Sequence, residues 1–265
     1  MEIQGVEAKQ IAFELADAAG AAILPHFRQA RLEIENKEAT GFDPVTVADR
    51  AGEAAMRRVL AELRPEDGIL GEEQGTTMGS SGLTWVLDPI DGTRGFMSGT
   101  PTWGVLISVS DQNGPLFGVI DQPFIGERFW GGLGLNGHSG PMGTGPLGAR
   151  SSTLKEAVIF TTFPEVGSEN ERLGFQQVAE KCRLTRYGMD CYAYALLAAG
   201  QIDLVVEAAL QPYDIHAPIA VVQAAGGIVT DWQGGPAHQG GRVIAAGCKE
   251  VHDTALEILR KIPND

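Results

Sequence analysis

The sequence predicts a mixed α/β protein, and three features of the chain carry this prediction. Apolar residues recur at helical spacing through most of the segment before Pro65. The pattern then changes to short apolar runs typical of strands, two of which are joined by the turn sequence from Asp111 to Gly114. After a glycine-rich stretch, strand-like and helix-like segments alternate, as they do in layered α/β folds.

The first part of the chain is expected to be α+β with an antiparallel component. Helices are predicted over residues 5–29 and from Thr46 to Leu63, with Pro65 ending the second. The apolar period of that second helix predicts a buried face formed by Val47, Ala51, Ala55, Val59 and Leu63. The strands predicted in this part are 83–87, 103–110, 118–121 and 127–131.

The composition shifts to glycine, proline and serine between Gly131 and Ser152. We place a boundary there, with residues 1–140 as a first domain and 141–265 as a second; a glycine-rich hairpin is the alternative. The second part is expected to be a layered α/β domain. Its predicted strands are 158–162, 204–207, 227–231 and 243–246, and its predicted helices are 169–182, 190–199, 215–225 and 250–261.

The charge balance limits the partners of the protein. The chain of 265 residues has 34 acidic and 20 basic side chains and a formal net charge of −14. Nucleic acids and anionic membranes are held largely by Lys and Arg, so neither is an expected partner. No apolar run reaches the about 18 residues of a membrane span. Residues 1–10 lack the pattern of a secretory signal, and the three cysteines form no Cys-x-x-Cys pair, so a cytoplasmic protein is expected.

The segment from Trp85 to Thr93 carries the sharpest chemical signal. An apolar strand is expected to end at Asp88 because Pro89 cannot continue the ladder, and Asp91 follows on the turn. Two carboxylates that leave a strand on a tight turn offer the oxygen ligands that Mg²⁺ prefers. The alternative is that both aspartates only cap local backbone groups.

Three further acidic residues have simple explanations when each is taken alone. Glu72, in Gly71-Glu72-Glu73, fits a solvated surface. Asp214, before an apolar helical segment, fits an N-cap. Asp49, three residues after Thr46, fits a variant capping box.

In chain order, however, these fragments resemble the inositol monophosphatase superfamily of Mg²⁺-dependent, lithium-sensitive phosphatases. The matching motifs are Asp43–Asp49, Gly71–Glu73, Asp88–Thr93, Tyr213-Asp214 and Ala224–Gly227. The resemblance covers nearly the whole chain, and Asp-Pro-Ile-Asp-Gly-Thr is its most specific element. It implies a layered αβαβα sandwich, a homodimer, and hydrolysis of small phosphate monoesters.

The resemblance also implies a role for individual residues. The implied ligands of two or three Mg²⁺ ions are Glu72, Asp88, the carbonyl of Ile90, Asp91 and Asp214. Thr93 and Asp49 resemble the pair that orients the attacking water, Glu72 could share the proton handling, and Lys37 could contribute to the metal site. The implied substrate-binding residues are Asp91, Gly92, Thr93, Asp190, Glu207 and Asp214, with Gly92 and Thr93 matching the amides that cradle phosphate.

This set of residues makes chemical sense for phosphate ester hydrolysis. Two metal ions about 3.5–4 Å apart clamp the attacking and leaving oxygens of an in-line displacement and activate water, so no Ser or Cys nucleophile is needed. A non-catalytic protein that binds metal or phosphate would lack one of the ligands. All of them are present here.

The flanking residues resemble the bacterial histidinol-phosphate phosphatases of this superfamily, which implies a place in histidine biosynthesis. The segments that carry this likeness are Asp91–Gly99, Arg186–Tyr194, Gln211–Ile215 and Thr230–Trp232. Inositol-1-phosphate or a range of sugar phosphates are the alternative substrates. Asp190 and Glu207 are the candidates to meet the ammonium group of histidinol phosphate, and a simple N-cap is the alternative for Asp190.

Overall fold

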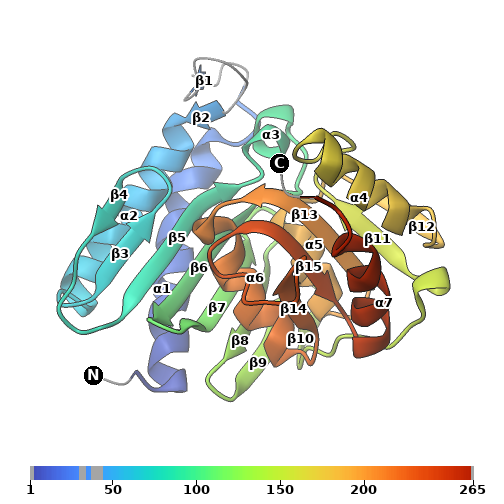
Figure 1. Ribbon diagram of the computed structural model, residues 1–265. Coiled ribbons are helices and arrows are strands. Elements are labelled where there is room, and N and C mark those ends of the chain that lie inside the picture. Colours follow the sequence, from blue (N-terminus) through green and yellow to red (C-terminus); the bar gives the residue numbers. More distant parts are fainter. Residues whose placement is uncertain (1–2, 30–33, 37–43, 264–265) are drawn as a thin grey trace.

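The computed structural model describes residues 3–29, 34–36 and 44–263, which form five stacked layers (Figure 1). Helices α1 (Gly5–Ile23) and α2 (Val47–Leu63) cover the outer face of an eight-stranded sheet. Helices α5 (Cys191–Ala198) and α6 (Pro212–Ala224) lie between this sheet and a five-stranded one, whose far face is covered by α4 (Glu169–Ala179) and α7 (Lys249–Leu259). The expected αβαβα sandwich is confirmed.

The larger sheet has the strand order β10-β9-β8-β7-β6-β5-β3-β4, and all its neighbours are antiparallel except β3 and β5. Its strands are β3 (Gly68–Gly71), β4 (Gly75–Thr77), β5 (Thr84–Asp91), β6 (Gly104–Asp111), β7 (Gly114–Gln122), β8 (Glu127–Gly132), β9 (Leu135–Gly140) and β10 (Gly143–Gly145). The predicted hairpin between β6 and β7 is confirmed. Within the glycine-rich stretch, β9 and β10 pair as a hairpin; the division into two domains stays a prediction.

The smaller sheet has the order β12-β11-β13-β15-β14, with β11 parallel to both of its neighbours and the remaining pairs antiparallel. Its strands are β11 (Val158–Thr161), β12 (Leu184–Tyr187), β13 (Leu204–Leu210), β14 (Ile228–Asp231) and β15 (Gly241–Ala246). A separate pair consists of β1 (Ile34–Asn36) and β2 (Pro44–Thr46). The short helices are η1 (Leu24–His26), α3 (Thr93–Ser98) and η2 (Leu154–Glu156).

The helices differ from the sequence prediction at several points; for example, α4 ends at Ala179 and not at 182, and α6 begins at Pro212 and not at 215. Helix α1 ends at Ile23 and only a short 3₁₀ turn follows, because Pro25 has no N–H with which to continue the α-helix. The predicted buried face of α2 was wrong in part: Val47 and Leu63 are exposed. Apolar spacing alone misjudged this face because its buried residues include two carboxylates, Asp49 and Glu53.

Among the described residues, no helix has the length and apolar character that crossing a membrane requires.

Candidate active site

The end of β5 contains an irregularity that shapes the site. Asp88 pairs with Leu106 and Asp91 with Gly104, so β5 has one residue more than β6 between these pairs. The strand therefore continues to Asp91 through a bulge, where the sequence predicted an end at Asp88. Residues three apart on a regular strand point to opposite faces, and an inserted residue changes that alternation. Both carboxylates of the motif can thus meet at one place.

A third carboxylate joins them from α6, in the layer between the two sheets. Oxygen atoms of Asp88, Asp91 and Asp214 all lie within 4.8 Å of one another. Asp214 lies in the first turn of α6, where its Oδ2 accepts a hydrogen bond from the backbone N–H of Gln211 at 2.7 Å. It is therefore the partner of the N-cap residue and not the N-cap itself. Glu72, on the turn between β3 and β4, contacts Asp88 by a side-chain hydrogen bond.

The cluster holds more negative charge than its surroundings balance. Burial, followed by repulsion from Glu72, Asp91 and Asp214, raises the pKa of Asp88 well above its ordinary value. Burial and the charge of Asp214 raise the pKa of Asp91 to about 7. Hard divalent cations bind to clustered carboxylate oxygens whose negative charge is not balanced by nearby positive groups. This acidic cluster could hold a metal ion.

The expected capping box at the start of α2 is present. It uses only one carboxylate oxygen of Asp49, so the other oxygen can contact Thr93. The Oδ2 atom of Asp49 accepts from the backbone N–H and the hydroxyl of Thr46, at 2.9 and 2.5 Å. Its Oδ1 atom lies 3.4 Å from the hydroxyl of Thr93, which also lies 3.2 Å from the carbonyl oxygen of Ile90. Burial raises the pKa of Asp49 to about 6, although both bonds from Thr46 oppose the shift.

A pocket of about 270 Å³ opens beside the carboxylate cluster and extends to the smaller sheet. It is lined by Asp91, Gly92, Thr93, Arg94, Thr162, Phe163, Val166, Asp190, Glu207, Ala208, Ala209, Leu210 and Asp214. Every substrate-binding residue that the sequence predicted therefore lies on its wall. These residues come mainly from the end of β5 and the start of α3, from the loop after β11, and from β13; Figure 1 shows where these elements lie in the fold.

Asp190 occupies the N-cap position of α5 but its side chain makes no cap hydrogen bond, so the simple capping explanation is wrong. Its φ of 46° and ψ of −136° form a sparsely populated combination for a residue with a side chain, at a cost of about 1–3 kcal/mol. Its carboxyl group lies against Gly92, where an added Cβ would come within 3.0 Å of the Asp190 Cγ. Burial and the charge of Asp91 raise the pKa of Asp190 to about 8, and Arg94 opposes this shift.

Glu207 is buried at the wall of the pocket and already has partners. It accepts hydrogen bonds from the hydroxyl of Thr161 at 2.9 Å and from the backbone N–H and hydroxyl of Thr162 at 2.6 and 3.0 Å. Burial nevertheless raises its pKa to about 8. These bonds fix the loop after β11, which carries Phe163 into the pocket.

Sequence analysis missed two groups on this wall. The guanidinium of Arg94 lies over the ring of Phe163, 5.1 Å from its centroid. Phe163 lies in a loop with no motif, so only the fold brings it here. The buried hydroxyl of Tyr194 has no hydrogen-bond partner among the described residues, and after burial the charges of Glu207 and Asp91 contribute most to raising its pKa. Lys37 and Asp43, which the family resemblance singled out, lie outside the described residues.

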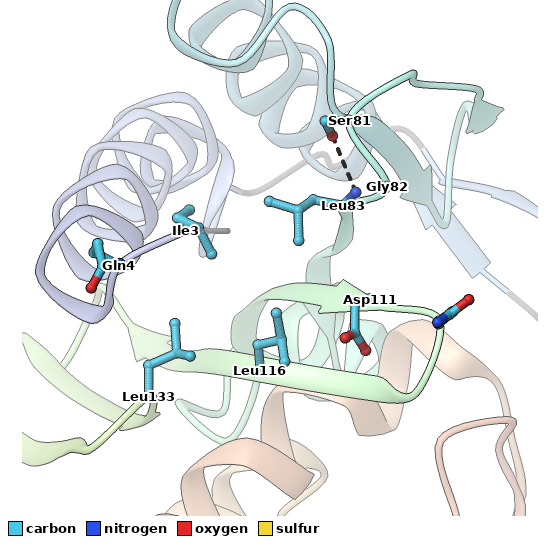
Figure 2. A pocket seen from close by; sticks show the side chains of 9 residues that line it. Ile3, Gln4, Ser81, Gly82, Leu83, Asp111, Leu116 and Leu133 are labelled. Carbon is cyan, nitrogen blue, oxygen red and sulfur yellow. Dashed lines mark hydrogen bonds between the residues drawn. The ribbon is translucent and has the colours of Figure 1, made fainter. Parts of the chain in front are cut away.

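A larger hollow of about 730 Å³ lies far from this chemistry, at the start of α1 (Figure 2). Figure 2 shows the apolar side chains of Ile3, Leu83, Leu116 and Leu133 around its opening. Asp111, its one carboxylate, already accepts two hydrogen bonds from Asn113. None of the predicted site residues lines this hollow.

Comparison with known proteins agrees with this geometry. The model of the inositol monophosphatase family matches residues 6–264. The chain is 39% identical over 257 residues to a protein of Arabidopsis thaliana named bifunctional phosphatase IMPL2, chloroplastic, covering 92% of this chain and 72% of that one. It is 32% identical over 263 residues to the histidinol-phosphatase of Streptomyces coelicolor, covering 95% and 96%.

Among solved structures, an inositol monophosphatase from Zymomonas mobilis superposes with a TM-score of 0.82 at 39% identity, covering 95% of this chain and 96% of that one. The protein is thus a member of the inositol monophosphatase family and a phosphoric monoester hydrolase.

Proposed function

We propose that this phosphatase hydrolyses histidinol phosphate to histidinol and inorganic phosphate. The observation that carries this proposal is the carboxyl group of Asp190, half-buried beside Gly92 in a strained backbone conformation and without a capping role. Strain of this kind is typical of functional positions. The ammonium group of histidinol phosphate is the complementary charge, and inositol phosphate has no such group.

The same residues fit divalent metal ions, and we infer two or three Mg²⁺ per site. Asp88, Asp91 and Asp214 would hold one ion, and Glu72, Asp88 and the carbonyl of Ile90 another; all these donors are hard oxygen atoms. When bound, Mg²⁺ supplies Lewis-acid chemistry that withdraws charge from the phosphate oxygens and lowers the pKa of water.

The residues of the chain then have distinct tasks. The backbone N–H groups at Gly92 and Thr93 face the phosphate at the start of α3, where N–H groups have no partner within the helix. The Thr93 hydroxyl, between the Asp49 carboxylate and the Ile90 carbonyl, orients the attacking water. Asp49 and Glu72 would hold its proton.

The ammonium group of the substrate would meet Asp190, and its positive charge would favour the ionised forms of Asp190 and of Glu207 on the smaller sheet, whose pKa values are otherwise raised to about 8. A charge-assisted hydrogen bond of this kind is shorter and stronger than a neutral one. We further propose that the protein acts in the cytoplasm, and that it is a homodimer, as the family resemblance implies; sedimentation analysis would test the dimer.

The deciding experiment is phosphate release from a panel of substrates by purified, metal-depleted protein, with and without added Mg²⁺. Histidinol phosphate should be hydrolysed with the highest kcat/KM, ahead of inositol 1-phosphate and glycerol phosphate. A preference for inositol 1-phosphate would replace the proposed substrate with that of another relative, the inositol-1-monophosphatase of Caulobacter vibrioides. Turnover of no substrate with Mg²⁺ present would contradict the proposal altogether.

A further inference from the structure

Glu53 is a fully buried carboxylate on α2, one helical turn after Asp49, and the site described above does not use it. Its Oε2 accepts a hydrogen bond from the backbone N–H of Glu73 at 2.7 Å. Its Oε1 accepts from the backbone N–H of Gln74 at 3.1 Å. Both donors lie on the turn between β3 and β4, directly after Glu72.

This turn belongs to a hairpin at the edge of the larger sheet, where β4 is exposed along its length. The N–H of Glu72 donates to the carbonyl oxygen of Leu87, the residue before Asp88, at 3.2 Å. The turn is therefore held on one side by β5 and on the other by the Glu53 carboxylate. These two attachments set where the side chain of Glu72 can reach.

Arg57 completes the arrangement one turn further along α2. Its Nε donates to Glu53 Oε1 at 2.7 Å, and its terminal nitrogens donate to the hydroxyl of Thr77 at 3.0 Å and the carbonyl of Gly75 at 2.5 Å. The guanidinium balances the charge of Glu53 and also fastens β4 to the helix. A buried carboxylate with three donors is well compensated, so its geometry is fixed.

The contact between Glu53 and the turn explains why position 71 is a glycine. A Cβ at Gly71 would lie 2.2 Å from Oε1 of Glu53 and 2.4 Å from its Cδ. Real Cβ atoms do not approach so closely, so any side chain at position 71 would displace the carboxylate. Gly71 is required for the contact between Glu53 and the turn.

We propose that Glu53 is a positioning residue for metal binding: its carboxylate fixes the turn after Glu72 and so sets the position of the Glu72 side chain beside Asp88. This inference rests on the proposed role of Glu72 as a metal ligand. Groups that orient a ligand in this way typically contribute about 10–100-fold to metal affinity or activity.

The test is Glu53→Gln, with Glu62→Gln as the matched control. Gln keeps the size of the side chain but presents an NH₂ group to one of the two backbone donors. Glu62 lies on the same helix but is exposed, so its substitution should change nothing measurable. Binding of Mg²⁺ and of Mn²⁺ is measured by titration calorimetry on metal-free protein, and phosphate release is followed against Mg²⁺ concentration.

We expect Glu53→Gln to weaken one class of metal site about tenfold or more, while the other site changes by less than about twofold. Turnover at saturating Mg²⁺ should return close to that of the unsubstituted protein, which a general loss of structure would not allow. Gly71→Ala should reproduce the weaker metal binding because it displaces the same carboxylate. Unchanged metal affinity in folded Glu53→Gln would overturn the inference.

A further variant, Glu72→Gln, separates this inference from the proposed function. If Glu72→Gln leaves metal binding unchanged, Glu72 is not a ligand and the proposed metal site itself is wrong. If Glu72→Gln weakens binding and Glu53→Gln does not, only the role of Glu53 is wrong. Should Glu53→Gln fail to fold, Arg57→Met tests the same contact, with a smaller loss of affinity expected and an unchanged affinity contradicting the inference.

Discussion

The backbone N–H of Cys191 donates a hydrogen bond to Oδ2 of Asp91 at 2.5 Å, across a separation of 100 residues. It joins the first residue of α5 to the last residue of β5. The bond places Asp190, the preceding residue, beside the carboxylate cluster. One contact thus connects the acidic cluster to the part of the pocket wall that Asp190 lines.

Asp91→Asn is expected to abolish most activity while preserving the fold. The amide oxygen of Asn can still accept from Cys191, but the charge available to a cation is lost. Losing an outer partner of a metal ligand already costs about 10–100-fold, so losing the ligand's charge should cost more. Phosphate release at about millimolar Mg²⁺, with circular dichroism as the control for folding, checks this.

The same substitution should stabilise the metal-free protein. In Asp91→Asn one of three mutually repelling carboxylates becomes neutral. Thermal unfolding in the presence of a chelator should therefore show a higher midpoint than that of the unsubstituted protein. A lower midpoint together with near-normal turnover would contradict the assignment of Asp91.

Thr93→Ala is expected to lower kcat by at least about tenfold and to change KM less, because it removes the group that orients water and not the charges that hold phosphate. Thr93→Ser, which keeps the hydroxyl, is the matched control and should retain most of the turnover. Steady-state kinetics on both variants checks this. A raised KM with unchanged kcat would show instead that Thr93 only helps to hold the substrate.

The residues of the candidate site could be predicted from the sequence, but the contacts that bring them together could not. Residues 88–93 are recognisable as a motif, yet the bulge that turns Asp88 and Asp91 toward each other depends on pairing with β6. The contact of Glu53 with the Glu72 turn is equally invisible in the sequence, because its donors lie 20 and 21 residues away.

The success of the secondary-structure prediction also depended on whether the sequence pattern is local and apolar. Most of the strands buried in the sheets, such as β6, have long apolar runs and were predicted, but the largely buried β3 was missed because two of its four residues are glycines. Strand β12 was missed because it lies at a sheet edge and is mostly exposed, so its four residues show no apolar pattern. The buried face of α2 was misjudged because two of its buried residues, Asp49 and Glu53, are carboxylates, which an apolar pattern does not include.

We predict that the free energy of unfolding falls in mild acid because His216 is kept neutral in the folded protein. Its Nε2 donates to the carbonyl of His238 and its Nδ1 accepts from the hydroxyl of Ser110, both at 2.8 Å, which fits the neutral ring. Burial lowers its pKa from 6.5 to about 4. As pH falls through this interval the unfolded chain gains a proton that the folded chain does not. The free energy of unfolding should fall by up to about 1.4 kcal/mol per pH unit from this group.

The check is urea unfolding at several pH values for the unsubstituted protein and for His216→Gln. Gln can donate to the carbonyl and accept from the hydroxyl without titrating, so its stability should depend less steeply on pH. Other groups that titrate in this interval are common to both proteins and cancel in the comparison. Parallel pH profiles would show that His216 is not kept neutral by the fold.

Asp190→Asn tests the choice of substrate. The variant keeps the shape of the side chain and removes the charge that would meet an ammonium group. Hydrogen bonds to charged groups contribute about 1.5–3 kcal/mol, so kcat/KM for histidinol phosphate should fall by about 10–150-fold. Hydrolysis of glycerol phosphate, which has no ammonium group, should change much less. Since Asp190 does not cap α5, a loss from a damaged helix start is not expected. Equal losses on both substrates would mean that the carboxylate serves the phosphate loop at Gly92 and not the ammonium group.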